Sequence, residues 1–98
     1  MVDVEAFFKQ HGDDEYLKDQ NIKPERRLHR RRDMNAFLLL DRLIPKNSDM
    51  IDGAQHDVFY LNVAPEELGE VATEEDILDL IRCGVHYDDE TDSLAIFA

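Results

Sequence analysis

The segment between Pro24 and Pro45 limits what this chain can fold into more than any other feature. Proline suits the first turn of a helix and cannot continue one, so the two prolines predict a long helix over residues 24–44. At 100° per residue, the apolar side chains of its second half, AFLLLDRLI, fall on one broad arc. We therefore expect this half to be a core helix on which the other elements pack.

The first half of the same segment, RRLHRRR at residues 26–32, is basic and is called the basic cluster below. Its arginines are Arg26, Arg27, Arg30, Arg31 and Arg32. On a helix, like charges four residues apart are destabilising by roughly 0.2–0.5 kcal/mol per pair. We therefore expect opposite charge close to the cluster. The acids that immediately precede it are Asp13, Asp14, Glu15 and Asp19.

Charge is divided unevenly along the 98 residues, whose formal net charge is −12. Residues 1–22 hold six acids and two lysines, and residues 23–46 hold three acids and eight basic residues. Residues 47–98 hold fourteen acids and a single arginine, Arg82. A chain with this balance should be repelled by nucleic acid and by anionic membranes. The negative potential of the remaining chain therefore opposes binding of a polyanion at the basic cluster.

Two shorter elements are predicted on either side of the long helix. Val4, Phe7 and Phe8 are spaced for one face of a short helix that ends near Gly12, and Asp13 could cap a further turn. DVFYLNV, at 57–63, has the β-branched and aromatic composition of a strand. The intervening KNSDMIDGAQ is predicted to be a polar loop.

The C-terminal part carries clear start and stop signals. Pro65 fits the first position of a short helix. Thr73 and Asp76 have capping-box spacing ahead of the apolar ILDLI, and Gly84 follows where a helix-ending glycine belongs. VHY and SLAIFA, on either side of the turn DDETD, predict a hairpin of two short strands.

These elements predict a single α+β domain over 1–98, with helices packed on a three-stranded antiparallel sheet. Its parts are an N-terminal helical segment (1–22), the long helix (24–44) and a strand–helix–helix–hairpin unit (57–98). From residue 24, the element order resembles that of a winged helix. The strand at 57–63 is apolar on both faces, which permits a homodimer that covers one of them.

A winged-helix order raises the possibility of DNA binding, and the charges oppose it. The helix that would enter the groove begins TEEDILDLI, with four acids and no base before Arg82. The hairpin turn, DDETD, has four acids in five residues. Contacts to phosphate need donors, usually Arg or Lys, so this surface is excluded as a DNA reader.

The same acids define the main candidate site, an acidic surface for a protein partner. The ordinary interpretation is a solvated acidic face. The more specific hypothesis is a surface that imitates the spaced phosphates of a duplex and occupies the basic groove of a nucleic-acid-binding protein. The predicted residues are Glu66, Glu67, Glu70, Glu74, Glu75, Asp76, Asp79, Asp88, Asp89, Glu90 and Asp92.

Metal and catalytic sites are not expected. Cys83 and His86 form one short-spaced pair, with His56 as a distant third ligand, whereas a structural zinc site uses four ligands. The acids of DDETDS lack the glycine and the twelfth-position ligand of a calcium loop. An acidic neighbourhood would raise the pKa of a cysteine nucleophile, and phosphate-loop and hydrolase motifs are missing. We expect a protein that is not an enzyme and needs no cofactor.

The cellular context is expected to be the cytoplasm. MVDVEAFF lacks the basic and apolar regions of a secretory signal, and apolar runs stay well below the ~18 residues of a membrane span. The single cysteine cannot form an intrachain disulfide.

HDVFYLNVAPEEL and DLIRCGVHYDDETDSLAIFA resemble segments of small uncharacterised proteins of bacteriophages and prophages. The resemblance covers about the C-terminal half and includes no catalytic or binding motif, so it assigns no functional residue. It implies a small phage-type accessory protein that acts on a host or phage macromolecule.

Three functions follow from the sequence as hypotheses. The leading one is an acidic protein-interaction module, a DNA-mimic-like inhibitor that binds a basic protein surface and not nucleic acid or membrane. The second is a nucleic-acid-binding regulator that uses the basic cluster. The third is a structural or assembly protein whose basic helix docks on another subunit.

Overall fold

Helices come before and between the strands in the computed structural model, which describes residues 1–45, 49–55 and 57–97. The α-helices of the described residues are α1 (Val4–His11), α2 (Arg32–Leu43), α3 (Pro65–Val71) and α4 (Glu74–Arg82). The strands are β1 (Ile51–Gln55), β2 (Val58–Leu61), β3 (Val85–Asp88) and β4 (Ser93–Phe97). Two 3₁₀ turns, η1 (Asp19–Asn21) and η2 (Pro24–Arg26), precede α2. The α+β class is confirmed.

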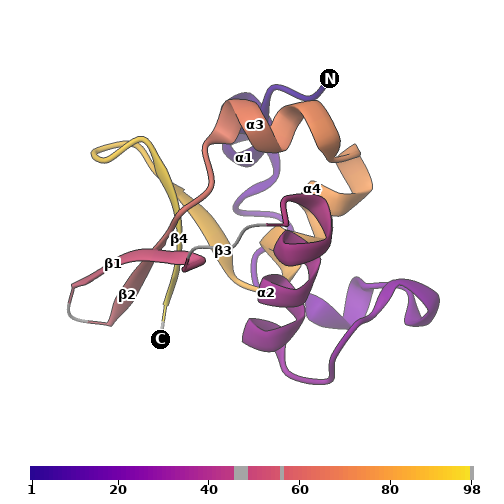
Figure 1. The fold of residues 1–98 in the computed structure, drawn as a ribbon. Coiled ribbons are helices and arrows are strands. Elements are labelled where there is room, and N and C mark those ends of the chain that lie inside the picture. The colour runs from indigo at the N-terminus through magenta and orange to yellow at the C-terminus, as the bar shows by residue number, and fades with distance from the viewer. Residues whose placement is uncertain (46–48, 56, 98) are drawn as a thin grey trace.

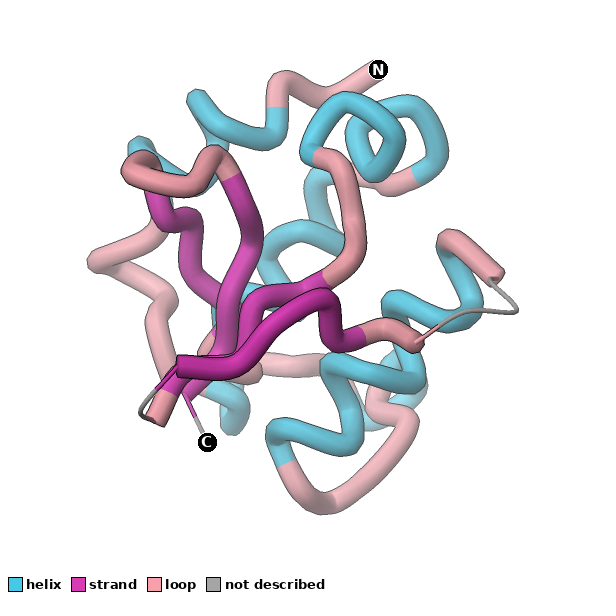
Figure 2. The backbone as a smooth tube through the Cα atoms, turned by 60° about the vertical axis from the view of Figure 1, so that its left-hand side comes forward, coloured by secondary structure: helices cyan, strands magenta, loops and turns pink. Residues whose placement is uncertain are grey.

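The strands form one antiparallel sheet in the order β1-β2-β4-β3. The sheet occupies one side of the molecule and the helices the other (Figures 1 and 2). The predicted hairpin is confirmed as β3 and β4, which pair Tyr87 with Leu94. From α2 onward the described elements keep the winged-helix-like order, with β1 as an addition between α2 and β2.

The sheet has four strands within the described residues, not the predicted three. Strand β1 lies in the segment that was predicted to be a polar loop, whose residues 46–48 lie outside the described part of the chain. It is an edge strand, mostly exposed, with a bulge between Ile51 and Gly53. Pairing with β2 holds it in place, so its own sequence needs no apolar alternation.

The long helix predicted over 24–44 is wrong in its first third. Pro24 does begin a turn, the 3₁₀ turn η2, but the backbone then becomes extended and α2 starts only at Arg32. The Oδ1 atom of Asn35, on α2, accepts hydrogen bonds from the backbone N–H groups of Leu28 (2.7 Å) and His29 (2.9 Å). These bonds tie the extended segment back onto α2 and replace helical hydrogen bonds.

The core lies between the helices and the sheet. Helix α1 buries the predicted Val4, Phe7 and Phe8, which confirms its apolar face. The segment after it makes turns and the 3₁₀ turn η1, and Asp13 caps no α-helix. The largest apolar side chains buried with α1 are Leu40, Leu68, Ile77, Leu80, Ile81 and Leu94.

Helix α4 begins and ends at the predicted signals. The Thr73 hydroxyl accepts from the Asp76 backbone N–H (3.1 Å), and the Asp76 carboxylate accepts from the Thr73 N–H (2.9 Å), which is the predicted capping box. Gly84, with φ of +101°, turns the chain out of the helix and into β3. The three charged residues at the start of α4 are therefore held at a defined position beside α3.

Candidate functional site

Arg26 of the basic cluster points into the protein and bridges two acids of α4. Its Nε donates to Asp79 Oδ2 at 2.8 Å, and its Nη2 donates to Asp76 Oδ1 at 2.6 Å. The hydrogen bond to Asp79 is the main cause that raises the pKa of the Arg26 guanidinium. Two residues of the predicted acidic surface thus serve as the counter-charge of an arginine fifty or more residues away.

The guanidinium of Arg27 is also bound within the chain. Its guanidinium donates to the carboxylate of Asp19 (2.9 Å) and to the Asp19 carbonyl (3.0 Å). It donates further to the carbonyls of His29 (3.0 Å) and Arg30 (2.8 Å). One planar group with several donors therefore organises the irregular segment ahead of α2. The expected counter-charge from Asp19 is confirmed.

The other three arginines of the cluster lie at the surface. Arg31 pairs with Asp33 at 3.0 Å, and Arg32 approaches Asp19 at 3.8 Å. Arg30 is exposed and makes no ion pair with the described residues. The cluster is therefore divided into an internal part and an exposed part.

A second internal centre surrounds Arg82, whose side chain is only 10% exposed. It pairs with Asp79 (3.0 Å), Glu15 (3.0 Å) and Glu75 (3.4 Å). The hydrogen bond from Arg82 is the main cause that lowers the pKa of the Glu15 carboxyl. Glu15 is thus the second preceding acid that acts as internal counter-charge, although for Arg82 rather than for the basic cluster.

Three of the predicted surface acids belong to this internal network. Asp79 is 2% exposed, so its assignment to the acidic surface was wrong: it lies between Arg26 and Arg82. Asp76 and Glu75 are half-buried and ion-paired. The other eight make no ion pair with a described residue, and they alone are called the acidic surface below; seven of them are exposed and Asp88 is half-buried. They are Glu66, Glu67, Glu70, Glu74, Asp88, Asp89, Glu90 and Asp92.

The acidic surface draws on separate elements that the fold brings together. Glu66 and Glu70 of α3 line one hollow with Asp92 of the β3–β4 turn, and the N-terminal residues Asp3 and Glu5 line it too. None of the eight carboxylates makes an ion pair with a described residue, although Asp92 accepts a hydrogen bond from the Tyr87 hydroxyl. The surface therefore carries uncompensated negative charge.

Sequence reasoning missed Asp3 and Glu5 as neighbours of this surface. Asp3 caps α1 by accepting from the Ala6 N–H (3.2 Å), and Glu5 pairs with Lys9 (3.2 Å). Both lie sixty residues or more from α3 in the sequence. The backbone N–H of Val2 donates to the Gly69 carbonyl (2.9 Å), which places this terminus against α3. No local sequence pattern predicts that contact.

Cys83 is a buried thiol in a polar contact. The Nδ2 of Asn35 donates to its Sγ at 3.2 Å. Burial is the main cause that raises the pKa of this thiol to about 11, so it is protonated at neutral pH. No group of three or more metal-ligating side chains occurs among the described residues, and His56, the considered third ligand, lies outside them. Of the helices described, none has the length and apolar character to cross a membrane.

Comparisons with family models, with curated proteins and with solved structures give no match for this chain.

Proposed function

We propose that this protein is a small acidic interaction module whose acidic surface occupies the basic nucleic-acid-binding surface of a partner protein and inhibits it, as a DNA mimic would. The observation that carries the proposal is the partition of charge. Arg26, Arg27 and Arg82 are paired internally, while eight carboxylates stay at the surface without ion-pair partners among the described residues.

Because of this partition, the exposed carboxylates of the C-terminal half produce a negative potential that a partner meets before contact. A surface of one sign steers an oppositely charged partner and speeds its association at low salt. The carboxylates would take the place of phosphates, which dominate the affinity of nucleic-acid-binding proteins. A phage-type inhibitor that acts in the cytoplasm on a host nucleic-acid-handling protein is the context that we propose.

The carboxylates of the acidic surface lie on elements that can hold them at fixed spacings, which specific recognition of a partner needs. Glu66, Glu67 and Glu70 are on α3, which leads directly into the capped N-terminus of α4. Asp88 ends β3, and Asp89, Glu90 and Asp92 lie in the turn that joins it to its partner β4. The spacing between the carboxylates is therefore held by regular structure, as a phosphate-like pattern would require.

A nucleic-acid-binding regulator that uses the basic cluster is the competing function. Arg30, Arg31 and Arg32 remain exposed and could contact phosphate. Arg26 and Arg27 are engaged within the chain, which removes two of the five donors on which that function would depend. The third hypothesis, docking of a basic helix on another subunit, loses its helix because α2 begins only at Arg32.

The test is competition for a partner. The immobilised chain captures proteins from a bacterial lysate at low salt, and each captured protein is purified and bound to a fluorescent DNA duplex. We expect the chain to displace the duplex, measured by fluorescence anisotropy, with an effect that falls as salt is raised.

Matched charge reversals make this test specific. The variant Glu67→Lys/Glu70→Lys/Glu90→Lys should displace the duplex at least about tenfold less well, which is the ratio that 1.4 kcal/mol produces. The control Asp14→Lys/Asp41→Lys/Asp52→Lys changes the net charge equally at exposed positions outside the acidic surface. Equal losses in both variants, or none in either, would contradict the proposal. A gel shift of free duplex by the wild-type chain would favour the basic cluster instead.

A further inference from the structure

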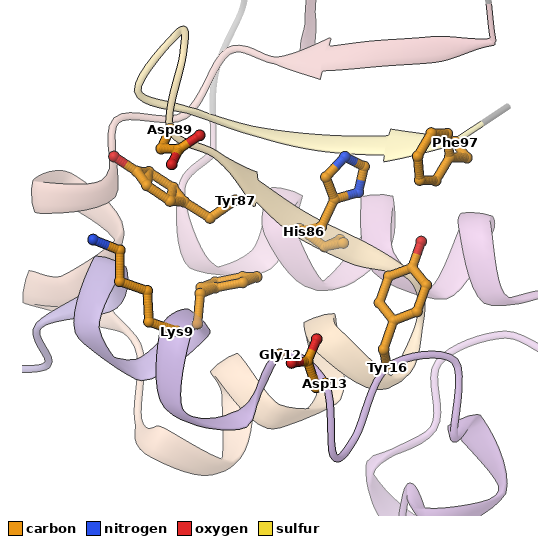
Figure 3. A pocket seen from close by; sticks show the side chains of 10 residues that line it. Lys9, Gly12, Asp13, Tyr16, His86, Tyr87, Asp89 and Phe97 are labelled. Atoms are coloured by element: carbon orange, nitrogen blue, oxygen red, sulfur yellow. The ribbon is translucent and has the colours of Figure 1, made fainter.

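A hollow of about 540 Å³ lies beside the acidic surface, between α1, the turn that follows it, β3 and the end of β4. Figure 3 shows the rings of Tyr16, His86 and Phe97 at one end of this hollow, and Lys9, Tyr87 and Asp89 at the other. The segments that supply these side chains are distant in sequence, so the fold alone creates the hollow. It is called the aromatic hollow below.

The aromatic end is built from three rings in contact. The rings of His86 and Phe97 are stacked, with centroids 4.6 Å apart and an angle of 21° between their planes. Tyr16 meets His86 edge-on at 6.4 Å and 76°. Phe97 is 56% exposed, which is unusual for a residue of this size and leaves one of its sides available to a ligand.

Charge at the hollow favours a cation. Asp13 and Asp89 both line it, both are exposed, and neither makes an ion pair with a described residue. Lys9 lines it as well, but its Nζ is paired with Glu5 at 3.2 Å. In Figure 3, Asp13 lies between Lys9 and Tyr16, so a carboxylate borders the aromatic end while the lysine lies away from it.

His86 adds an unused polar atom. Its Nδ1 is buried and has no hydrogen-bond partner among the described residues. Burial is the main cause that lowers the pKa of this imidazole, and the backbone of Gly84 opposes the shift. The ring is therefore neutral at pH 7, and a cation that stacks on it meets no like charge.

We propose that the aromatic hollow binds the guanidinium group of an arginine presented by a protein partner. A planar guanidinium stacks on aromatic rings through cation–π attraction, and its N–H donors suit a carboxylate such as Asp13. The anionic phosphates of a nucleotide would instead meet Asp13 and Asp89. This inference rests on the proposed function, because it names the residue type by which a basic partner would be anchored.

The direct test is an NMR titration of the full chain with the peptide acetyl-Gly-Arg-Gly-amide. We expect saturable shifts of the Tyr16, His86 and Phe97 amide signals, at millimolar concentrations typical of one side chain. The matched probe replaces arginine by citrulline, which keeps the shape and removes the charge, and it should cause no such shifts. Equal binding of both peptides, or binding of adenosine monophosphate at these residues, would overturn the proposal.

Variants locate the binding. Phe97→Ala removes an exposed ring, so the fold should persist, and it should weaken arginine-peptide binding about tenfold or more. Asp13→Asn should weaken it by a smaller factor. The control Val71→Ala removes an apolar side chain of similar exposure, 51%, on α3 and should bind as the wild type does. Unchanged affinity in Phe97→Ala refutes the assignment.

The two proposals can fail separately. The variant Glu67→Lys/Glu70→Lys/Glu90→Lys should keep its aromatic hollow and bind the arginine peptide within about threefold of the wild type. If no partner is displaced from DNA but the peptide binds as expected, the hollow stands and the DNA-mimic function falls. If the peptide fails to bind while displacement occurs, only the anchoring residue type is wrong.

Discussion

Asp79 accepts hydrogen bonds from two arginines that reach it from opposite directions along the chain. Arg26 lies 53 residues before it, and Arg82 lies one turn after it on α4. With both oxygens engaged and 2% exposure, the carboxylate is a structural counter-charge. Removal of one partner from such a network leaves the others buried without compensation.

We therefore predict that Asp79→Asn lowers the free energy of unfolding by about 3–5 kcal/mol, because two partly buried guanidinium groups lose their shared carboxylate. Urea denaturation followed by circular dichroism measures the change. Glu67→Gln, which removes the same charge from an exposed position, should alter stability by less than about 0.5 kcal/mol. Similar losses in the two variants would mean that Asp79 has no special role.

The segment between α1 and α2 shows how an element without long regular structure is held. Its helical structure is limited to two 3₁₀ turns, yet Glu15 attaches it to Arg82 of α4, and Asn35 of α2 accepts from its backbone. The pair of Asp19 and Arg27 joins its two parts to each other. Leu17 adds a backbone hydrogen bond to the Ile81 carbonyl at 3.3 Å. Side-chain contacts therefore hold residues 24–31 in place, where the sequence predicted the first part of a helix.

Low pH should weaken the attachment of this segment, and the variant Glu15→Gln measures how much the Glu15 charge contributes. The pKa of Glu15 is held below its ordinary value of 4.5, mainly by the hydrogen bond from Arg82. Its contribution is therefore complete above that ordinary value and is lost as the pH falls through the lower folded-state pKa. We expect Glu15→Gln to be less stable than the wild type by about 1 kcal/mol at pH 7.

The same difference should shrink as the pH falls through the lowered folded-state pKa of Glu15, since the wild-type carboxyl then also becomes neutral. Chemical denaturation of both proteins at several pH values measures it. A gap that stays constant from pH 7 down to the lowest pH at which both proteins remain folded would show that Glu15 acts through its shape and not its charge.

At the scale of the whole molecule, carboxylates without an ion pair outnumber cations without one among the residues that the structure describes. The net charge is −12, and Arg26 and Arg82 are already paired. Mutual repulsion of exposed charges destabilises a compact state, and salt screens exposed charges more than buried pairs. The molecule as a whole should therefore behave as a self-repelling anion.

We predict that the free energy of unfolding rises when sodium chloride is raised from about 10 to about 200 mM, because the Debye length shortens over this range. Thermal and urea denaturation measure the rise. The variant Glu67→Gln/Glu70→Gln/Glu90→Gln carries less unpaired charge and should gain less from salt. A fall in wild-type stability with salt would indicate that exposed ion pairs outweigh the repulsion.

The sequence by itself determined the features that depend on neighbours along the chain. The capping box of Thr73 and Asp76, the turn at Gly84, the apolar face of α1 and the C-terminal hairpin all follow from residues a few positions apart. Together they were enough for the α+β class and for the order of most elements. The uneven distribution of charge was equally plain in the sequence.

Tertiary structure decided which charges face solvent, where α2 begins, and that β1 and the aromatic hollow exist. Arg26 with Asp79, and Tyr16 with His86, are contacts between residues far apart in sequence. Strand β1 depends instead on its pairing with the neighbouring β2, which the composition of residues 51–55 does not predict. Burial and ion pairing are properties of a three-dimensional neighbourhood, whereas a sequence pattern reports only the periodicity of one segment. The sequence therefore predicted that the basic cluster lies on one helix. In the structure, Arg26 and Arg27 are paired within the chain, and the other three arginines are exposed.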